Sequence, residues 1–375
     1  MIYRDFGNSG ARVSSLGFGC MRFPMIGEGD AARVDDSLVT PMIKRAYELG
    51  VNYFDTAWGY CNSDSQRALG VAVKGFRDKI YISTKLPMWS VKKADDFWYF
   101  LKESLKRLDM DYIDFYHFHS MNREHWEQVV LPFKLIDLAE QAKAKGMIRH
   151  LSFSFHDKRD LMDEMVDTGA FTSLLCQYNL IDRSNEEGMA YASSKGVGIT
   201  VMGPVGGGNL ALGGKDFLAK FDVPAESGAE LAIKFVLGNP SVSIALSGMT
   251  SLEMVEENVR HSEAARVITR EDWEKLTKNT DELKALASNY CSGCNYCDVC
   301  PKGIKPSEVF DAYNRYKVWG LNEVAKRRYS RFGTSENHTA HPDLCISCGA
   351  CARKCPQRLD IPTELKKMTA ELKAL

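Results

Sequence analysis

The stretch SLVTPMIKRAYELGVNYFD, residues 37 to 55, joins an amphipathic helical pattern to a short β-rich run. Gly50 lies at the junction, where glycine can take the left-handed conformation that ends a helix. The run VNYFD that follows has the composition of a strand. Because this helix-and-strand unit recurs along the chain, and strict alternation implies a parallel sheet, the unit decides the fold.

Eight β-rich runs separated by helical patterns lie in the first part of the chain: VSSLGFG (13–19), VNYFD (51–55), KIYIST (79–84), YIDFYHFH (112–119), IRHLSFS (148–154), SLLCQY (173–178), VGITVMG (197–203) and VSIALSG (242–248). Eight repeats in about 250 residues favour a closed barrel over an open doubly wound sheet. The alternation then stops, and a sequence with helical periodicity and most of the cysteines follows. We therefore predict an α/β chain with a (β/α)8 TIM barrel over residues 1–275 and a small, mostly α-helical domain over residues 281–375.

Charge and hydropathy exclude several classes of protein. The 48 Lys and Arg residues are balanced by 49 Asp and Glu residues, for a net charge of -1, so no basic footprint for nucleic acid is present. The N-terminal sequence MIYRDFGNSGARV has no basic head followed by an apolar run, and no later window is apolar enough to cross a membrane. We expect a cytoplasmic protein with neither a membrane nor a nucleic acid as its partner.

Four side chains are expected at one mouth of the barrel, because catalytic groups in such barrels lie at the C-terminal ends of strands and in the loops after them. Asp55 ends the second predicted strand, Tyr60 lies in the loop that follows, Lys85 ends the third strand and His119 ends the fourth. Each residue alone has a structural explanation, and a single His at a strand end is more often a hydrogen-bonded structural residue. The four residues together indicate a catalytic site.

A Tyr beside a Lys and a buried Asp makes sense as a proton donor. A free phenol has a pKa near 10, and a neighbouring ammonium favours the phenolate. Asp55 would keep Lys85 charged, and an imidazole at His119 would donate to a carbonyl oxygen while Tyr60 delivers the proton. This set of residues suits the reduction of a carbonyl group or the reverse oxidation.

The segments RDFGNSGARVSSLGFG, VNYFDTAWGY, ISTK and YIDFYHFH resemble motifs of the aldo-keto reductases, in the same order on the same barrel. The resemblance extends over roughly residues 1 to 270. It implies that Asp55, Tyr60, Lys85 and His119 are catalytic, with His119 rather than His117 as the family's histidine. It also implies a nicotinamide cofactor, NADPH or NADH.

Two segments are candidates for holding that cofactor, because phosphate sites in these barrels use the loops after strands seven and eight. GPVGGGNL (203–210) offers Gly203, Pro204, Val205, Gly208 and Leu210, and SGMTSLEMVEEN (247–258) offers Ser247, Gly248, Met249 and the start of a helix. The family resemblance adds Ser154 and Gln177 near the nicotinamide carboxamide, and Glu257 and Asn258 near the adenine.

The chain departs from the family pattern at two of these places. Phe155 stands where the family often has Asn, and residues 247–258 contain neither of the basic residue types that pair with the 2'-phosphate of NADPH. The choice between NADH and NADPH therefore stays open.

Eight of the eleven cysteines form two runs near the C-terminus, CSGCNYCDVCP (291–301) and CISCGACARKCP (345–356). The second run reproduces the bacterial ferredoxin pattern C-x2-C-x2-C-x3-C-P, and zinc sites usually have cysteine pairs with a longer spacer. We predict two [4Fe-4S] clusters. One would be held by Cys291, Cys294, Cys297 and Cys355, and the other by Cys345, Cys348, Cys351 and Cys300, with the crossing less secure because the first run is one residue shorter before its last Cys.

The sequence between Cys300 and Cys345 has a largely helical pattern. It looks like the helical ferredoxin modules of succinate dehydrogenase iron-sulfur subunits. The whole chain thus resembles aldo-keto reductases with a ferredoxin-type domain. The resemblance implies an NAD(P)(H)-dependent oxidoreductase acting on an aldehyde, ketone or sugar carbonyl, or on the corresponding alcohol, with clusters for electron transfer or structural support. The alternative is a non-catalytic protein that senses nucleotide or redox state.

A partner for the clusters is suggested by charge. Residues 281–375 contain 15 Lys and Arg against 11 Asp and Glu, and the sharpest basic run holds Lys326, Arg327, Arg328 and Arg331. Such a run is usually a solvated helix face. It would also attract an acidic electron carrier such as a ferredoxin or flavodoxin.

Overall fold

The structure is a computed structural model of the 375-residue chain. It describes residues 1–180, 182–219, 221, 223–265, 268–286, 291, 293–317, 322–335, 337 and 339–375. The chain divides into two compact units. The barrel unit comprises Met1–Asn179, Arg183–Pro204 and Ala232–Trp273, and the cysteine unit comprises Leu180–Asp182, Val205–Leu231 and Glu274–Leu375. The break at Trp273 lies close to the expected boundary, but Val205–Leu231 is grouped with the C-terminal part, which the sequence did not indicate.

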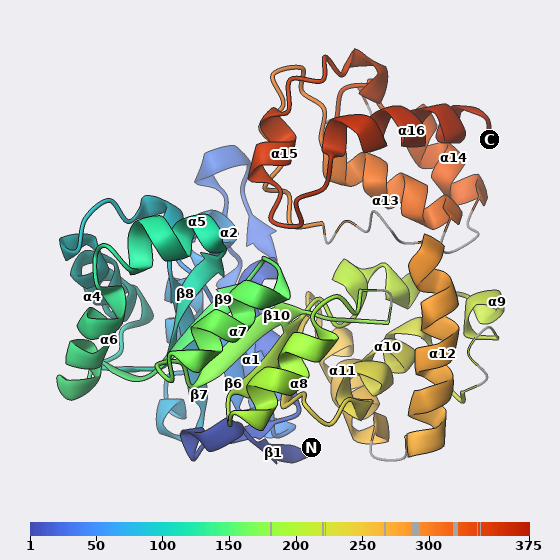
Figure 1. Cartoon of the computed structure of the whole chain (residues 1–375). Helices are drawn as coiled ribbons and strands as arrows, with labels where there is room; N and C mark the ends of the chain where they lie inside the picture. Colours follow the sequence, from blue (N-terminus) through green and yellow to red (C-terminus); the bar gives the residue numbers. More distant parts are fainter. Residues whose placement is uncertain are drawn as a thin grey trace. The chain divides into compact units, whose positions relative to one another are not determined.

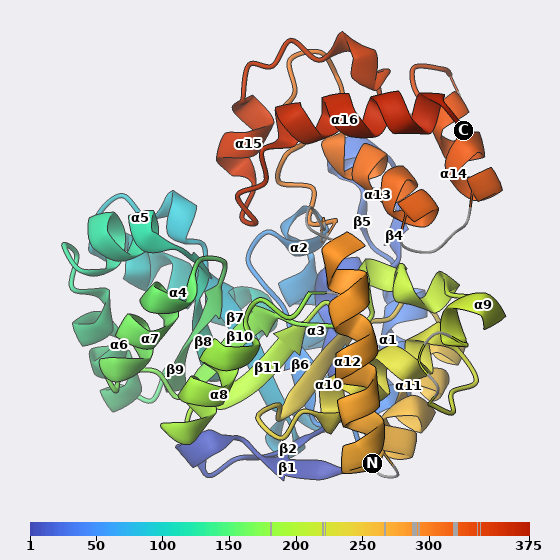
Figure 2. The same ribbon diagram turned by 45° about the vertical axis from the view of Figure 1, so that its right-hand side comes forward.

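Eight parallel strands form a closed barrel, as predicted (Figures 1 and 2). Each strand pairs with the next along the chain, and the last pairs with the first. The strands are β3 (Leu16–Gly19), β6 (Tyr53–Asp55), β7 (Tyr81–Leu86), β8 (Ile113–Met121), β9 (Ile148–Phe155), β10 (Ser173–Gln177), β11 (Gly198–Met202) and β12 (Ile244–Gly248). The predicted fold class is confirmed.

The first predicted strand, residues 13–19, is wrong as a single element. It is split into β2 (Arg12–Ser14), which pairs antiparallel with β1 (Tyr3–Asp5), and β3 of the barrel. The chain changes partners at Ser15, whose N–H donates to the carbonyl of Ile2 while its own carbonyl accepts from the N–H of Ala245.

The β1–β2 hairpin packs on the N-terminal end of the barrel. Phe6 is fully buried between the rings of Tyr53 and Phe115, with centroid distances of 5.6 and 4.9 Å. Gly7 has a φ of 54°, and a Cβ there would lie 2.3 Å from the carbonyl oxygen of Gly196, so only glycine allows this approach. The hairpin therefore closes the end of the barrel opposite to Asp55.

Helices surround the barrel in Figures 1 and 2. They bury apolar stripes against the strands; in α4 the buried residues include Phe97, Leu101, Leu105 and Leu108, at helical spacing. The helices with most of their length in this unit are α1 (Asp36–Glu48), α2 (Tyr60–Ser63), α3 (Ser65–Ala72), α4 (Asp95–Leu108), α5 (Arg123–His125), α6 (Leu135–Ala144), α7 (Arg159–Asp167), α8 (Glu186–Ser194), α10 (Gly228–Gly238) and α11 (Leu252–Ala264).

The cysteine unit has a helical core of its own. Phe310 of α13 (Pro306–Lys317), Ala325 of α14 (Asn322–Ser330) and Leu365 of α16 (Ile361–Lys373) are buried in it together with Cys297 and Cys351. The other helices there are α9 (Lys215–Leu218) and α15 (Ala350–Lys354). The boundary between the two units falls within α12 (Arg270–Leu286), after Trp273. None of the helices formed by the described residues is long and apolar enough to span a bilayer.

Candidate functional site

The centre of the barrel mouth is a buried ion pair. The Nζ atom of Lys85 lies 2.6 Å from Oδ2 of Asp55 and 2.8 Å from the carbonyl oxygen of Thr56, and Ser83 donates to the other carboxylate oxygen. Both charged side chains are almost completely buried. Burial lowers the pKa of Lys85, and the Asp55 carboxylate opposes part of that shift. The strands fix this geometry, because Asp55 of β6 is paired with Ser83 of β7 and Lys85 lies two residues further on the same face.

Tyr60 and His119 meet above this pair. The Lys85 ammonium lies 4.8 Å from the centroid of the Tyr60 ring, and the His119 ring lies 6.1 Å from it at an interplanar angle of 80°. Burial, and then the Lys85 charge, hold the pKa of His119 well below its ordinary value of 6.5. The structure thus brings together the four side chains that the sequence proposed, with the imidazole neutral.

His117 and His119 are separated by their surroundings. His117 pairs with Lys85 in the sheet register and is fully buried, and burial lowers its pKa to about 3. Between Phe118 and Met121 the register of β8 shifts, and Ser120 takes a left-handed φ of 57°. His119 lies just before this irregularity, and it is His119 that contacts the Tyr60 ring.

An unusual turn follows Tyr60. Cys61, Asn62 and Ser63 have φ values of 52°, 52° and 66°, a run of three non-glycine residues in the left-handed region. Such a conformation costs about 1–2 kcal/mol per residue and persists only when its surroundings hold it. Here the Asn62 amide donates to the carbonyls of Gly29 and Ala32, at 3.0 and 3.1 Å. Sequence reasoning missed this anchor, which fixes the backbone next to Tyr60.

The apolar residues near the mouth differ in their accessibility. Trp89 is 44% exposed, and its ring centroid lies 5.0 Å from that of His119. Trp58 is half-buried beneath the guanidinium of Arg107, at 3.6 Å. Phe23 and Met121 are buried, so of the four apolar residues near the mouth the two tryptophans offer surface to a ligand.

Two predicted cofactor residues lie at the ends of neighbouring strands. Ser154 of β9 accepts a hydrogen bond from the N–H of Ser120 at 2.7 Å. The Nε2 atom of Gln177, the last residue of β10, is buried and has no hydrogen-bond partner among the described residues. A Cβ on Gly203 would lie 2.6 Å from that atom, so glycine is needed beside it. A buried amide donor left without a partner fits the carbonyl of a nicotinamide carboxamide.

The Gly-rich loop is shared between the two units. Gly203 and Pro204 belong to the barrel unit, and Val205, Gly208 and Leu210 belong to the cysteine unit. Gly208 has a φ of 93°, and Leu210 is buried.

The other cofactor segment forms the end of β12 and the start of α11. The Asn258 amide donates to the hydroxyl of Ser247 at 3.1 Å, and the Ser251 hydroxyl caps α11 by accepting from the N–H of Met254. The side chain of Met249 is fully buried, so it offers no surface to a ligand. Glu257 is exposed on α11.

Arg22 is a basic residue that the sequence reasoning missed. It follows β3, which pairs with β12 through Gly19 and Gly248. The Cδ atom of Arg22 would lie 3.4 Å from a Cβ on Gly248, so the arginine stem covers this glycine. A cation from the turn after β3 thus lies beside the segment that has no Lys or Arg of its own. The sequence feature that could have identified Arg22 is its position just after a predicted barrel strand.

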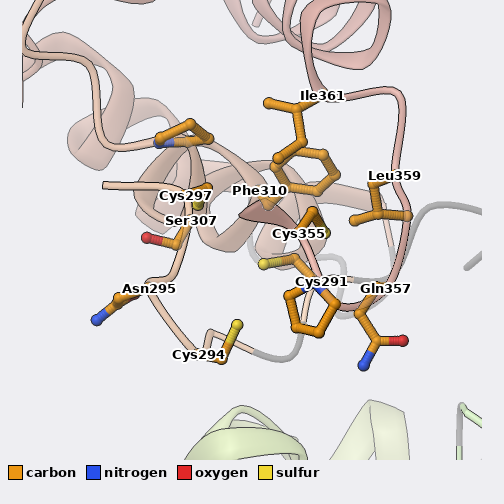
Figure 3. A pocket seen from close by; sticks show the side chains of 12 residues that line it. Cys291, Cys294, Asn295, Cys297, Ser307, Phe310, Cys355, Gln357, Leu359 and Ile361 are labelled. Carbon is orange, nitrogen blue, oxygen red and sulfur yellow. The ribbon is translucent and has the colours of Figure 1, made fainter. Parts of the chain in front are cut away.

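Four cysteines from the two cysteine runs face a common space in the cysteine unit (Figure 3). This group, called site one, comprises Cys291, Cys294, Cys297 and Cys355, and its walls include Phe310, Leu359 and Ile361. Burial raises the pKa of Cys291 to about 12, and the three other thiols add to the rise. Four convergent thiols with apolar walls suit a cationic iron-sulfur core, which neutralises thiolates where solvent does not.

The other four cysteines form a second group, called site two. Cys351 lies within electrostatic range of Cys300 and Cys345, and Cys348 follows in the same loop. Cys355 thus lines the space of the first run, and Cys300 lies near Cys351 of the second run. The ligand sets of the two clusters stay a prediction.

The two cysteine loops repeat one backbone conformation. Gly293 and Asn295 flank Cys294 with φ values of 70° and 66°, and Ser347 and Gly349 flank Cys348 with 53° and 71°. In the first loop the N–H of Gly293 donates to Sγ of Cys291 at 3.4 Å. Left-handed residues in such loops turn N–H groups toward a bound anionic group.

Comparison with known proteins agrees with this geometry. The model of the aldo/keto reductase family matches residues 15–281, and the model of a 4Fe-4S dicluster domain matches residues 290–359. L-galactose dehydrogenase of Arabidopsis thaliana is 28% identical, over 68% of this chain and 86% of the relative. A probable voltage-gated potassium channel subunit beta of Oryza sativa is 24% identical, over 74% of this chain and 95% of the relative. The holo form of an aldo-keto reductase from Bacillus halodurans superposes with a TM-score of 0.64 at 27% identity, over 74% of this chain and 96% of that one.

Proposed function

The chain belongs to the aldo/keto reductase family and carries a 4Fe-4S dicluster domain, and from this premise we propose that it transfers hydride between NADPH or NADH and a small carbonyl or alcohol substrate. The observation that carries the proposal is the convergence of Tyr60, Lys85 and His119 at the mouth, with Asp55 beneath. Its site of action is the reducing cytoplasm, where cysteines stay reduced instead of forming disulfides.

Tyr60 is the proposed proton donor. In the direction of reduction, its O–H passes a proton to the substrate oxygen as negative charge develops there, and the phenolate that remains is stabilised by the Lys85 ammonium. Asp55 holds that ammonium in place at 2.6 Å. Oxidation of an alcohol uses the same groups in reverse, with the Tyr60 phenolate accepting the proton.

His119 has a different proposed role. Because its pKa is held well below 6.5, the ring is a neutral hydrogen-bond donor rather than an acid. A neutral imidazole beside Tyr60 orients the substrate carbonyl without adding a second charge near Lys85. The exposed face of Trp89, next to His119, then offers an apolar wall to the rest of the substrate.

The chain's own residues are proposed to hold the cofactor as follows. Gln177 and Ser154 receive the carboxamide, and Ser247, Gly248 and the start of α11 lie toward the phosphates, with Asn258 and Glu257 near the adenine. When bound, the nicotinamide supplies or takes up the hydride. Arg22 is the proposed partner of an anionic group of the nucleotide, because it lies over Gly248 in a segment without other cations.

The test is a screen of anaerobically purified full-length protein for carbonyl-dependent oxidation of NADH and NADPH. Aldehydes, ketones and sugars belong in the panel, and the L-galactose dehydrogenase relative supports including sugar lactols and their alcohols. We expect consumption of at least one nucleotide with at least one carbonyl class. Absence of turnover in both directions, with nucleotide binding intact, would contradict the proposal.

A second candidate function is a nucleotide or redox sensor without turnover. One relative supports this candidate, because it is named a probable voltage-gated potassium channel subunit beta and not an enzyme. The two candidates differ in their need for Tyr60. A sensor would keep its nucleotide affinity and its output when Tyr60 becomes Phe, whereas a reductase would lose turnover.

We also propose that sites one and two hold two [4Fe-4S] clusters that pass single electrons, with an acidic ferredoxin or flavodoxin as their partner. The basic run at residues 326–331 is less available for docking than its sequence suggests. Arg328 pairs with Glu308 and Asp311, both at 2.9 Å, and Lys326 bonds the terminal residue Leu375. Structural support by the clusters is the alternative, and it predicts sites that resist mild reductants.

A further inference from the structure

The two cysteine sites differ in how much of them reaches the surface. In site one, Cys297 is 6% exposed, Cys291 is mostly buried and apolar side chains line the space between the sulfur atoms (Figure 3). In site two, Cys348 is an exposed cysteine. We propose that site two is where an electron carrier docks, and that site one is the inner cluster of the pair. This inference rests on the electron-transfer role proposed above.

Exposed apolar residues adjoin the cysteines of site two in the sequence. Ile346 is 59% exposed, Leu344 is 53% exposed and Val299 is 47% exposed. Each is the immediate neighbour of a site-two cysteine, since Leu344 and Ile346 flank Cys345 and Val299 precedes Cys300. Single exposed apolar residues are ordinary, but three beside one metal site form an apolar rim that a partner can cover.

Charged residues of both signs adjoin the same rim. The exposed carboxylates Asp298 and Asp343 directly precede Val299 and Leu344, and Asp343 lies 3.9 Å from Lys373. Two cations lie there as well. Lys302 lies two residues after Cys300 and is exposed. Arg353 lies two residues after Cys351, is exposed and donates to the carbonyl of Cys348 at 3.2 Å. Together with the three apolar residues they make up the site-two face: Val299, Lys302, Leu344, Ile346 and Arg353.

The loops that carry this face are held against each other. The N–H of Ala340 donates to the carbonyl of Gly303, next to Lys302, and the N–H of Lys305 donates to the hydroxyl of Thr339. Ala340 and Thr339 lead directly into the segment of Leu344 and Cys345. The segment after Cys300 is therefore joined by hydrogen bonds to the segment that leads into Cys345.

The chemistry of this face selects its partner. An apolar centre with cations beside it complements a small acidic carrier protein whose own redox centre lies at an apolar edge. The exposed Cys348 lets that centre approach the cluster without intervening protein. In the step itself one electron leaves the reduced carrier and converts a [4Fe-4S]2+ core to [4Fe-4S]1+, and no bond forms or breaks and no proton moves.

The test uses full-length protein with both clusters and a reduced plant-type [2Fe-2S] ferredoxin as the probe. Anaerobic stopped-flow absorbance follows the bleaching of the clusters, and calorimetry with oxidised ferredoxin gives the dissociation constant. Ile346→Glu places a negative charge, the same sign as that of the acidic ferredoxin, among the apolar residues of the face. We expect it to lower the second-order rate constant at least about tenfold and to raise the dissociation constant by a similar factor.

The matched control is Val324→Glu, an equal change at an exposed residue of α14 beside the basic run. It should stay within about twofold of the parent, because rim changes outside an interface cost little. Dithionite, a small reductant that needs no docking face, should reduce all variants at the parent rate. A second variant, Lys302→Gln with Arg353→Gln, should weaken the salt dependence of the ferredoxin rate, which keeps the test informative if Ile346→Glu loses iron.

Two outcomes overturn the inference. One is an Ile346→Glu protein with full iron content that ferredoxin reduces as fast as the parent, and the other is a larger loss in Val324→Glu. A third outcome separates the proposals: if dithionite reduces the parent protein but ferredoxin does not, the electron-transfer role fails, while nicotinamide turnover measured on the same preparation still decides the reductase function.

Discussion

The barrel mouth and the cysteine unit both gather side chains from distant parts of the sequence, but they fix those side chains by different means. Asp55 and Lys85 are held by the register of adjacent strands, and each compensates the charge of the other at 2.6 Å. The thiols of site one come from loops, and their surroundings are other thiols, apolar side chains and a few polar groups, with no cationic side chain among the residues that line the space. The mouth is therefore complete as a charge arrangement before any ligand binds, whereas the cysteine sites need a cationic core.

The largest expected effect tests the strand-held site. Tyr60→Phe removes the proton donor and leaves the Lys85–Asp55 pair and the barrel core in place. Because general acid catalysis contributes at least about 100-fold, we expect kcat for carbonyl reduction to fall by that factor or more. Fluorescence titration with NADPH or NADH should give an unchanged dissociation constant.

A Tyr60→Phe protein that keeps more than about a tenth of the parent rate would mean that the proton comes from another group. Lys85→Met serves as the companion variant, because it keeps Tyr60 but leaves Asp55 as an uncompensated buried charge. It should lose activity and thermal stability together, whereas Tyr60→Phe should lose activity alone.

The next effect concerns the part of the mouth that a loop holds. Asn62→Ala removes both hydrogen bonds to the carbonyls of Gly29 and Ala32 and puts a less tolerant residue at a φ of 52°. We expect the Tyr60 backbone to lose its fixed position, with kcat falling about tenfold and cofactor affinity unchanged. Steady-state kinetics with a melting curve measures both.

Asn62→Gly separates the two causes, since glycine relieves the left-handed strain but makes no hydrogen bond. If this variant recovers full kcat, strain alone matters and the anchoring role is wrong. Equal losses in both variants would support the hydrogen bonds as the positioning element.

Sequence reasoning predicted what depends on periodicity and spacing. The alternation of strands and helices gave the barrel, and the strand ends placed Asp55, Lys85 and His119 at one mouth. The x2 and x3 spacings of the cysteines predicted a group of Cys291, Cys294, Cys297 and Cys355, and these four line one space in the structure. These features were readable because each follows from a local pattern and a topological rule.

The missed features depend on contacts between segments far apart in the chain. The split of residues 13–19 into two strands arises because Ser15 changes partner between Ile2 and Ala245. Arg22 reaches Gly248 only because the last strand of the barrel closes against the first. The pairing of Arg328 with Glu308 and Asp311 turned an apparently free basic run into a partly neutralised one.

A smaller, twofold effect tests the loop-held sites. Anaerobically isolated protein should contain about eight iron atoms per chain, four in each cluster. Cys355→Ser removes a ligand of site one, and we expect the iron content to fall to about four with site two retained. Iron analysis with EPR of the reduced protein measures the content and identifies the remaining cluster.

Cys176→Ser is the matched control, because Cys176 is a buried cysteine of β10 outside both sites. It should keep about eight iron atoms per chain. A Cys355→Ser protein that also keeps about eight would show that neither cluster needs Cys355. One that falls to about four but loses the site-two signal instead would show that the crossing between the two runs is wrong.

The smallest effect is a pH dependence that the mouth should lack. An ordinary His would add an acid limb to kcat/KM near pH 6.5, but burial and then the Lys85 charge hold the pKa of His119 well below that value. The neutral imidazole is therefore the dominant form at pH 6.5, and protonation of His119 should change the rate of reduction less than about twofold around that pH. Burial also lowers the pKa of Lys85, so its positive charge is lost earlier than in a free lysine as the pH rises. Reduction should accordingly slow on the alkaline side, where the Lys85 charge is lost. A pH series of kcat/KM in both directions measures this, with His119→Gln as the reference.

An acid limb near pH 6.5 that disappears in His119→Gln would show that the His119 ring titrates in the working range. The proposal of a neutral hydrogen-bond donor at the mouth would then be wrong.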